Sequence, residues 1–276
     1  MTSGQTGAVV RLARRLLRGP QLNHLVRFEP VLRLVRERPT TSPTLLDVGS
    51  GTQGIASLLP PGWQVTSVDA DFEDYGAATG RRVGPDQVVG DVRALPFADR
   101  AFDFVVAVDL LEHVPPDGRE QAVQEICRVA GSRAVVACPA GEQALAADRR
   151  LAERILASGR AVPPWLTEHL DNGFPQAAEI AAAAAAFGTV RLLANENLAA
   201  HERLVWAELR PVTALALRLL CRPLRWMLAG DRRPAQVARA VLRAVRGSDR
   251  APTYRAVVAI DIRPAGAAQF ERHSSE

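Results

Sequence analysis

A glycine-rich segment between two apolar runs constrains this chain more than any other feature. The segment is GSGTQG, residues 49–54, and the apolar run before it is TLLDV at 44–48, which predicts a short buried strand of a parallel sheet. Glycines at the end of such a strand let a ligand approach the backbone, and the start of the following helix offers N–H groups. Gly49, Gly51 and Gly54 fit the GxGxxG spacing, although an ordinary tight turn has the same composition.

Strand-like and helix-like segments alternate along the rest of the chain. Strands are predicted at 63–69, 86–91, 102–110, 132–139, 188–194 and 253–263, and helices at about 8–18, 21–38, 55–59 and 117–130, with mostly helical structure over 140–187 and two more helices within 198–247. This alternation predicts an α/β fold, with a parallel sheet covered by helices on both faces.

Charge divides the chain into four parts. Residues 1–40 form a predicted N-terminal helical appendage, 41–200 the core with a substrate-side insert at about 140–180, 201–250 a basic helical insert or cap, and 251–276 the last core strand and tail. Every basic side chain is Arg; residues 1–40 hold 8 Arg against 2 acids, and 201–250 hold 11 Arg against 4 acids. The core is acidic and its appendages are basic.

The cysteines and the apolar segments indicate the cellular compartment that is expected for this protein. Cys127 and Cys138 fall on predicted core faces, and none of the three cysteines belongs to a CxxC pair, so a reducing cytoplasm is expected. The His and Cys spacings match no metal motif, and no metal site is predicted. The first apolar stretch is broken by arginines and does not read as a signal peptide. The run at 212–230 contains Arg218, Arg222 and Arg225 and is not expected to cross a membrane.

Two acids frame the glycine segment. Asp69 ends the second strand, 22 residues after Asp47, and a carboxylate there can accept both ribose hydroxyls of an adenosine. That feature fits NAD and S-adenosylmethionine equally. Asp47 stands immediately before the glycines, where it would repel a pyrophosphate but suit the ammonium group of an amino-acid ligand.

LLDVGSGTQG resembles motif I of class I S-adenosylmethionine-dependent methyltransferases. The segment VVGDVRALPFADRAFDFVVAVDLLEHV is similar to the next part of that family, especially its type 11 branch. The resemblance covers roughly 44–139. It implies a Rossmann-like sandwich with a seven-stranded, mostly parallel sheet and an antiparallel C-terminal strand, here with N-terminal helices and a helical insert before the last strand. It also implies S-adenosylmethionine as cofactor.

The resemblance assigns residues to each end of the cofactor. The residues assigned to the methionine end are Asp47, Gly49, Ser50 and Gly51, with Gly54 as the third glycine of the loop and Asp109 and Leu110 nearby. The ribose is assigned to Asp69 and Ala70. The adenine is assigned to Asp91 and the Val92 N–H. Two of these have other readings: Asp91 as a helix cap and Asp109 as a turn acid. The family often has glycine at the position of Gln53, a departure that would alter the loop.

The acceptor side is expected in PPWLTEHLDNGFP, residues 163–175. Methyl transfer to oxygen or nitrogen needs a base near the acceptor's proton, and His169 is the candidate, oriented by Glu168 or Asp171. The alternative is that His169 caps or packs this insert. His113, in LEHV, either faces the substrate or packs locally.

Arginines recur at helical spacing in three segments: Arg11, Arg14, Arg15 and Arg18; Arg218, Arg222 and Arg225; and Arg239, Arg243 and Arg246. The helices that carry them would lie on an anionic membrane or form a lid with solvated arginines. Nucleic acid is disfavoured because stacking aromatics are not interleaved with the arginines.

The sequence therefore predicts an S-adenosylmethionine-dependent methyltransferase that acts on a small molecule, a glycan or a lipid-linked metabolite, through O-methylation. Two alternatives remain open. One is a non-catalytic binding or scaffold protein with the same fold, and the other is an NAD(P)-dependent oxidoreductase, against which Asp47 argues. The sequence does not predict the oligomeric state.

Overall fold

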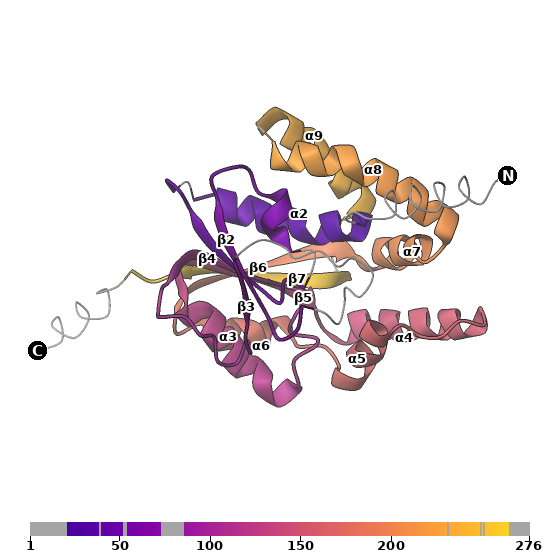
Figure 1. Cartoon of the computed structure of the whole chain (residues 1–276). Helices are drawn as coiled ribbons and strands as arrows, with labels where there is room; N and C mark the ends of the chain where they lie inside the picture. The colour runs from indigo at the N-terminus through magenta and orange to yellow at the C-terminus, as the bar shows by residue number, and fades with distance from the viewer. Residues whose placement is uncertain are drawn as a thin grey trace, which may run out of the picture.

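A seven-stranded mixed sheet forms the centre of the computed structural model, which describes residues 21–38, 40–51, 54–72, 86–230, 232–248, 250 and 252–264 (Figure 1). The strands are β1 (Thr44–Val48), β2 (Gln64–Asp69), β3 (Gln87–Val89), β4 (Phe102–Val108), β5 (Ala130–Pro139), β6 (Gly188–Asn197) and β7 (Thr253–Ile262). Their order in the sheet is β3-β2-β1-β4-β5-β7-β6, and β7 pairs antiparallel with both of its neighbours. The predicted fold class, with its antiparallel last strand, is confirmed.

Helices cover both faces of this sheet. The α-helices are α2 (Leu22–Arg36), α3 (Arg119–Arg128), α4 (Glu142–Ala157), α5 (Pro164–Asn172), α6 (Ala177–Ala184), α7 (Leu198–Glu208), α8 (Pro211–Ala229) and α9 (Arg232–Arg246), and two short 3-10 helices are η1 (Ile55–Leu58) and η2 (Pro116–Gly118). Figure 1 shows α2, α8 and α9 on one side of the sheet and α3 and α6 on the other.

The strand pleat divides the core between the two faces. Along β4, Phe104 and Val106 belong to the cluster under α2, whereas Val105 and Ala107 belong to the cluster under α3 and α6. Alternate residues of a strand point to opposite faces, so a strand covered on both sides must be apolar throughout. The run FDFVVAV is apolar apart from Asp103 near its start, which explains why the central strand was recognisable in the sequence.

The parallel strands all end at the same edge of the sheet. The loops after β1, β2, β4 and β5 therefore gather there, and β7, which runs the opposite way, begins there: Arg255 pairs with Pro139 at the end of β5 and with Asn195 in β6. Helices α4 and α5 extend from this end of the molecule (Figure 1). Open α/β sheets bind their ligands outside this edge.

Two local predictions differ from the structure. Residues 55–59 were expected to continue a helix, but η1 is one 3-10 turn, because Pro60, Pro61 and Gly62 follow it at once. The region 198–247 was expected to hold two helices and holds three, because Pro211 begins a new helix after α7.

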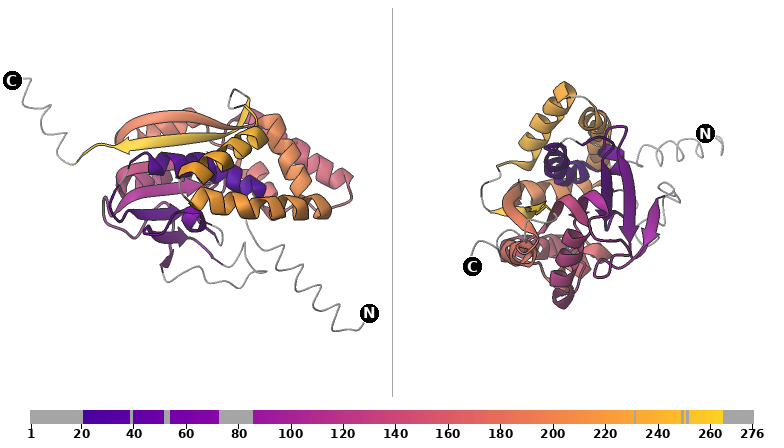
Figure 2. Two further views of the ribbon diagram at one scale, coloured as in Figure 1. Left: turned by 90° about the horizontal axis from the view of Figure 1, so that it is seen from above. Right: turned by 90° about the vertical axis from the view of Figure 1, so that its left-hand side faces the viewer.

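The basic helices α8 and α9 pack over α2 (Figure 2). Two of the three arginines of one expected face are turned inward: Arg246 is 6% exposed and donates to Glu29 at 3.1 Å, and Arg239 lies 3.7 Å from the same carboxylate, whereas Arg243 is exposed. Glu29 lies in α2, so Arg239 and Arg246 join α9 to α2. The predicted helix at 8–18 with its four arginines lies outside the described residues, as does Gln53.

None of the helices in the described ranges is long and apolar enough to cross a lipid bilayer. Cys127, Cys138 and Cys221 are all buried, as free thiols.

Candidate functional site

The turn after β1 is held against the neighbouring strands. The Gly49 N–H donates to the Val68 carbonyl at 2.8 Å, and both Gly49 and Gly51 have positive φ, at 70° and 50°. A Cβ atom at Gly49 would lie 2.7 Å from Cδ1 of Leu110, so a side chain is excluded there. A Cβ atom at Gly51 would meet nothing within 4 Å, which leaves open space beside a bare backbone.

Asp47 lies beneath this turn and is 1% exposed. The Ile55 N–H donates to its Oδ2 atom at 2.7 Å. Burial raises the pKa of Asp47 to about 7, against the lowering effects of that hydrogen bond and of Arg27. A Cβ atom on Gly54 would lie 2.1 Å from the same Oδ2 atom, so the loop can pass over the carboxylate only where Gly54 has no side chain.

Asp69, at the end of β2, contacts the same loop. Its Oδ2 atom accepts from the Gly51 N–H at 2.7 Å, and its Oδ1 atom accepts from the Asp71 N–H at 3.2 Å. The carboxylate therefore fixes the glycine loop to β2. Asp91, beyond β3, instead forms an exposed ion pair with Arg93, with its Oδ2 atom 2.7 Å from Nη2, and this hydrogen bonding lowers the pKa of Asp91.

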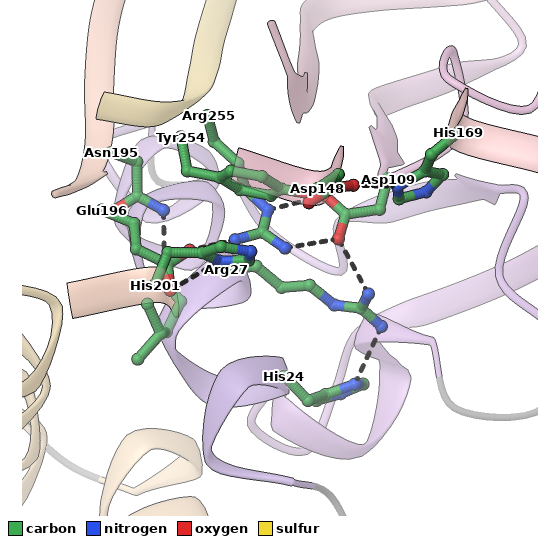
Figure 3. Close-up of polar contacts among 11 residues, drawn as sticks. His24, Arg27, Asp109, Asp148, His169, Asn195, Glu196, His201, Tyr254 and Arg255 are labelled. Atoms are coloured by element: carbon green, nitrogen blue, oxygen red, sulfur yellow. Dashed lines mark hydrogen bonds and ion pairs between the residues drawn. The ribbon is translucent and has the colours of Figure 1, made fainter. Parts of the chain in front are cut away.

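Asp109, just after β4, is bound by two arginines (Figure 3). Arg255 donates to both carboxylate oxygens at 2.8 Å, and Arg27 donates to Oδ2 at 2.9 Å. Burial alone would raise the pKa of Asp109, but the two guanidinium groups outweigh it and lower the pKa. Asp109 has φ of 50°, a conformation disfavoured for a residue with a side chain. The bonds to Arg255 and Arg27 fix this geometry.

The network continues away from Asp109. Arg255 also donates to Glu196, and Glu196 lies 3.2 Å from Nδ1 of His201. His201 stacks on Tyr254, with ring centroids 3.3 Å apart. His24, from α2, contacts Nη2 of Arg27 at 3.3 Å through Nδ1 (Figure 3). These buried charges are paired across α2, β6, α7 and β7, so the N-terminal helix and the last strand fix the same edge of the sheet.

A histidine–carboxylate pair lies on the α4 and α5 side of this edge. Nδ1 of His169 is 2.7 Å from Oδ2 of Asp148, and the Tyr254 hydroxyl donates to Asp148 at 3.0 Å. The histidine is 6% exposed and the aspartate 1%. A carboxylate that accepts the Nδ1 proton leaves Nε2 as the basic nitrogen.

A second histidine lies beside the first. The ring centroids of His113 and His169 are 5.1 Å apart, and Nδ1 of His113 is 2.6 Å from Oε2 of Glu168. Burial and the neighbouring His169 lower the pKa of His113, although Glu168 opposes this. Glu112 precedes His113 in the chain and is fully buried. Burial together with the charge of Asp109 raises the pKa of Glu112 well above the usual range.

One arginine joins α5 to the loop after β4. Arg119 donates to the carbonyl oxygens of Leu111 and Val114 and to those of Asn172 and Gly173. Both histidines are therefore positioned by segments that this guanidinium ties together.

The chain matches one family model over the strands and loops that build this edge. Residues 46–138 match the Methyltransf_11 model, which describes a methyltransferase domain. Residues 46–138 therefore form a methyltransferase domain of the kind that this model describes. The resemblance predicted from the motifs is confirmed, and S-adenosylmethionine is the methyl donor. The matched residues run from β1 to the end of β5, so they contain both the glycine loop and the LEHV segment.

Several solved structures are similar to this chain at low identity. Phosphoethanolamine N-methyltransferase 2 of Haemonchus contortus, in complex with S-adenosyl-L-methionine, is 14% identical; the match covers 86% of this chain and 52% of that one, with a TM-score of 0.47. The YcgJ protein of Bacillus subtilis is 18% identical, with 86% and 99% covered and a TM-score of 0.44. A TehB-like S-adenosylmethionine-dependent methyltransferase of Corynebacterium glutamicum is 29% identical, with 40% and 62% covered and a TM-score of 0.32.

The residues of the methyltransferase domain fit the cofactor. The space beside the Gly51 backbone is open, and buried Asp47, with its raised pKa, is a carboxylate that forms no ion pair with the described residues. A sulfonium amino acid supplies an ammonium group for such a carboxylate, and an adenosine supplies hydroxyls for Asp69. The cofactor roles of all the assigned residues, Ser50, Ala70, Val92 and Leu110 included, stay predictions.

The residues predicted to face the acceptor have partners that the sequence did not indicate. His169 is held by Asp148, whereas Glu168 contacts His113 and Asp171 is exposed. Successive residues of a helix point about 100° apart, so the side chain of Glu168 is directed away from that of His169 and contacts His113 instead. These partners come from two elements: Asp148 from α4, and Tyr254 and Arg255 from β7. The sequence marks them in one way only, since each is a polar residue in an otherwise apolar or core-facing stretch.

Proposed function

We propose that this protein transfers the methyl group of S-adenosylmethionine to a hydroxyl group of a small or lipid-linked acceptor. The observation that carries the proposal is the pair formed by His169 and Asp148 at the same sheet edge as the glycine loop. N-methylation of an amine already in its neutral form needs no such base, whereas a hydroxyl must lose its proton.

The cofactor half of the proposed site uses the glycine loop. Asp47 would hold the ammonium group of the methionine end, the backbone of Gly49 to Gly51 would contact its carboxylate, and Asp69 would accept the ribose hydroxyls. S-adenosylmethionine, when bound, supplies an electrophilic methyl group, so the protein has to align the acceptor and exclude water.

His169 would take the acceptor's proton at Nε2. Asp148 fixes the tautomer, since it accepts at Nδ1 and would stabilise the imidazolium formed when Nε2 is protonated. Tyr254 donates to Asp148 and keeps that carboxylate in place. Its own pKa is raised well above the usual value by burial and by Asp148, so the hydroxyl stays a donor.

The exposed surface of α8 supports a lipid-linked acceptor. Six apolar residues of this helix occupy an arc of about 120° and are exposed: Val212, Ala216, Leu219, Leu220, Pro223 and Trp226. Trp226 is 74% exposed, and Arg222 and Arg225 are exposed beside this stripe. Neither α8 nor α9 contains an acidic residue. An apolar stripe with flanking cations is typical of helices that lie on anionic lipid surfaces.

Methyl transfer from labelled S-adenosylmethionine to a panel of phenolic, sugar and lipid-linked hydroxyl acceptors tests the proposed function. We expect label in a hydroxyl acceptor with the native protein and almost none with His169→Gln, while both bind the cofactor equally. Transfer to amines alone would overturn the assignment of O-methylation. Cofactor binding with no turnover on any acceptor would favour the scaffold protein, and NAD binding would favour an oxidoreductase.

A further inference from the structure

Three side chains on the acceptor side present ligand atoms to one another. Glu112, His113 and His169 each offer one oxygen or ring nitrogen, and these atoms all lie within 4.8 Å of one another. Two imidazoles bound to one tetrahedral ion by bonds of about 2.1 Å would have ring centroids roughly 5 Å apart. The centroids of His113 and His169 are 5.1 Å apart. We propose that Glu112, His113 and His169 form a binding site for a divalent transition-metal ion such as Zn²⁺.

The buried carboxyl group of Glu112 supports a cation site independently of the two histidines. Its side chain is 0% exposed, and neither of its oxygens has a hydrogen-bond partner within the described part of the chain. Buried polar groups are nearly always satisfied, and an unsatisfied carboxylate is costly. A bound cation would supply a counter-charge to this group and would be coordinated by its oxygens.

A carboxylate contacts the Nδ1 atom of each histidine. Asp148 contacts His169 at 2.7 Å and Glu168 contacts His113 at 2.6 Å. Histidines that bind metal ions commonly donate their second ring nitrogen to a carboxylate, which fixes the ring and makes the ligating nitrogen more basic. The arrangement assigns Nε2 of each ring to the ion.

The donor set selects the kind of ion. Two imidazole nitrogens and one carboxylate oxygen suit Zn²⁺ and Co²⁺ better than Ca²⁺ or Mg²⁺, which prefer oxygen ligands. Trp165 and Phe174 lie edge-on to His169 at 5.2 Å and exclude water from one side. The sequence spacing did not reveal this site because His113 follows β4 and His169 lies in α5, and only the fold brings them together.

The inference goes beyond the proposed function and constrains it. An ion at this site would occupy the Nε2 atom that the proposed mechanism gives to the acceptor's proton. Bound Zn²⁺ would therefore inhibit methyl transfer. Metal binding itself is measured without cofactor or acceptor, so the two proposals can fail separately.

The experiment is a calorimetric titration of the full-length, chelator-treated protein with Zn²⁺, together with the visible absorption spectrum of the Co²⁺ form. We expect one high-affinity ion per chain and a tetrahedral or five-coordinate Co²⁺ spectrum. Glu112→Gln, which keeps the shape of the side chain, and His113→Ala should each weaken binding by at least ten-fold. Asp148→Asn should weaken it by roughly 10- to 100-fold through the orientation of His169.

Asp171→Asn is the matched control, because it removes an exposed carboxylate on α5 that is not one of the three ligands. It should bind Zn²⁺ like the native chain. Thermal unfolding of each variant without metal separates loss of the site from loss of the fold. The proposal is overturned if the native chain binds no ion, or if a folded Glu112→Gln, His113→Ala double variant binds as tightly as the native chain.

Discussion

The Nδ1 atom of His169 lies 2.7 Å from the Oδ2 atom of Asp148, and this contact joins α5 to α4 inside the protein. The Tyr254 hydroxyl reaches the same carboxylate from β7. Three separate elements thus meet at the carboxylate of Asp148, and the orientation of His169 is set by the tertiary fold and not by its own helix.

Replacing Asp148 by Asn should reduce methyl transfer strongly while sparing cofactor binding. An amide at this position can donate to Nδ1 and so favour the wrong tautomer of His169, and a lost general base typically costs 10²- to 10⁴-fold in rate. The measurement is kcat with the best hydroxyl acceptor, beside the calorimetric affinity for S-adenosylmethionine. A variant that keeps its full kcat would show that His169 is not the base.

Asp69→Ala should weaken S-adenosylmethionine binding by roughly 1–3 kcal/mol, the range for a lost buried polar partner. The carboxylate also accepts from the Gly51 N–H, so part of the loss could come from a loosened loop. Asp69→Asn is the matched control, since its carbonyl oxygen can still accept from Gly51 while it no longer accepts from both ribose hydroxyls. Equal affinities of Asp69→Ala and the native chain would remove Asp69 from the ribose site.

Cofactor binding should release a proton near pH 6. Asp47 has a pKa raised to about 7, so most of it is protonated at that pH, and an ammonium group beside it would favour the ionised form. Calorimetric titrations in buffers of different ionisation enthalpy measure the release. Asp47→Asn should abolish it; an unchanged proton count in that variant would mean that another group titrates.

The same carboxylate makes the stability of the cofactor-free protein depend on pH. The pKa of Asp47 is higher in the folded protein than its ordinary value of 3.8, so the folded state binds more protons between pH 3.8 and about 7. Its contribution to the free energy of unfolding is complete below pH 3.8 and is lost as the pH rises towards 7. Denaturant unfolding of the native chain and of Asp47→Asn across this window measures the difference, which should vanish at low pH.

Gly54→Ala should destabilise the protein by about 1–3 kcal/mol through overpacking. The new Cβ atom would lie 2.1 Å from Oδ2 of Asp47, and the loop would have to move. Asp47→Ala in the same chain should relieve much of this cost, which a double-mutant cycle of unfolding free energies reveals. Additive losses would show that the collision with Asp47 is not the cause.

Vesicles that contain phosphatidylglycerol should bind the protein in sedimentation assays, and vesicles of phosphatidylcholine alone should not. Substitution of Leu219 and Trp226 by Ser removes apolar area from the stripe on α8 and should reduce binding several-fold. Leu156→Ser is the control, because Leu156 is 60% exposed on α4, away from this stripe. Equal losses for the control would indicate nonspecific adsorption to vesicles. Binding that persists at high salt would indicate an interaction that is not electrostatic.

Much of the fold and the cofactor half of the candidate site could be predicted from the sequence. Apolar runs such as TLLDV, which forms β1 from end to end, mark buried strands, and Asp47 and Asp69 are recognisable because they stand at the last or next-to-last position of such strands. These features depend on residues close together in the chain, where spacing carries the information.

The acceptor half was predictable only in part, because its contacts are long-range. His169 was singled out, but its partner Asp148 comes from another helix and Tyr254 from the far end of the chain. Helical spacing also suggested one exposed face for Arg239 and Arg246, although buried Glu29 in α2 draws both inward. A charge pattern alone does not reveal which charges find a buried partner.

The position of β7 has a consequence for biosynthesis. This strand is synthesised last of all the described elements, yet it lies between β5 and β6 and supplies Tyr254 and Arg255. A nascent chain that has reached β6 but not β7 therefore still has an open sheet, and Asp148 lacks the hydroxyl group of Tyr254. Because chains are made from the N-terminus onward, the glycine loop is synthesised well before the strand that anchors Asp148 and Asp109 at the other side of the candidate site.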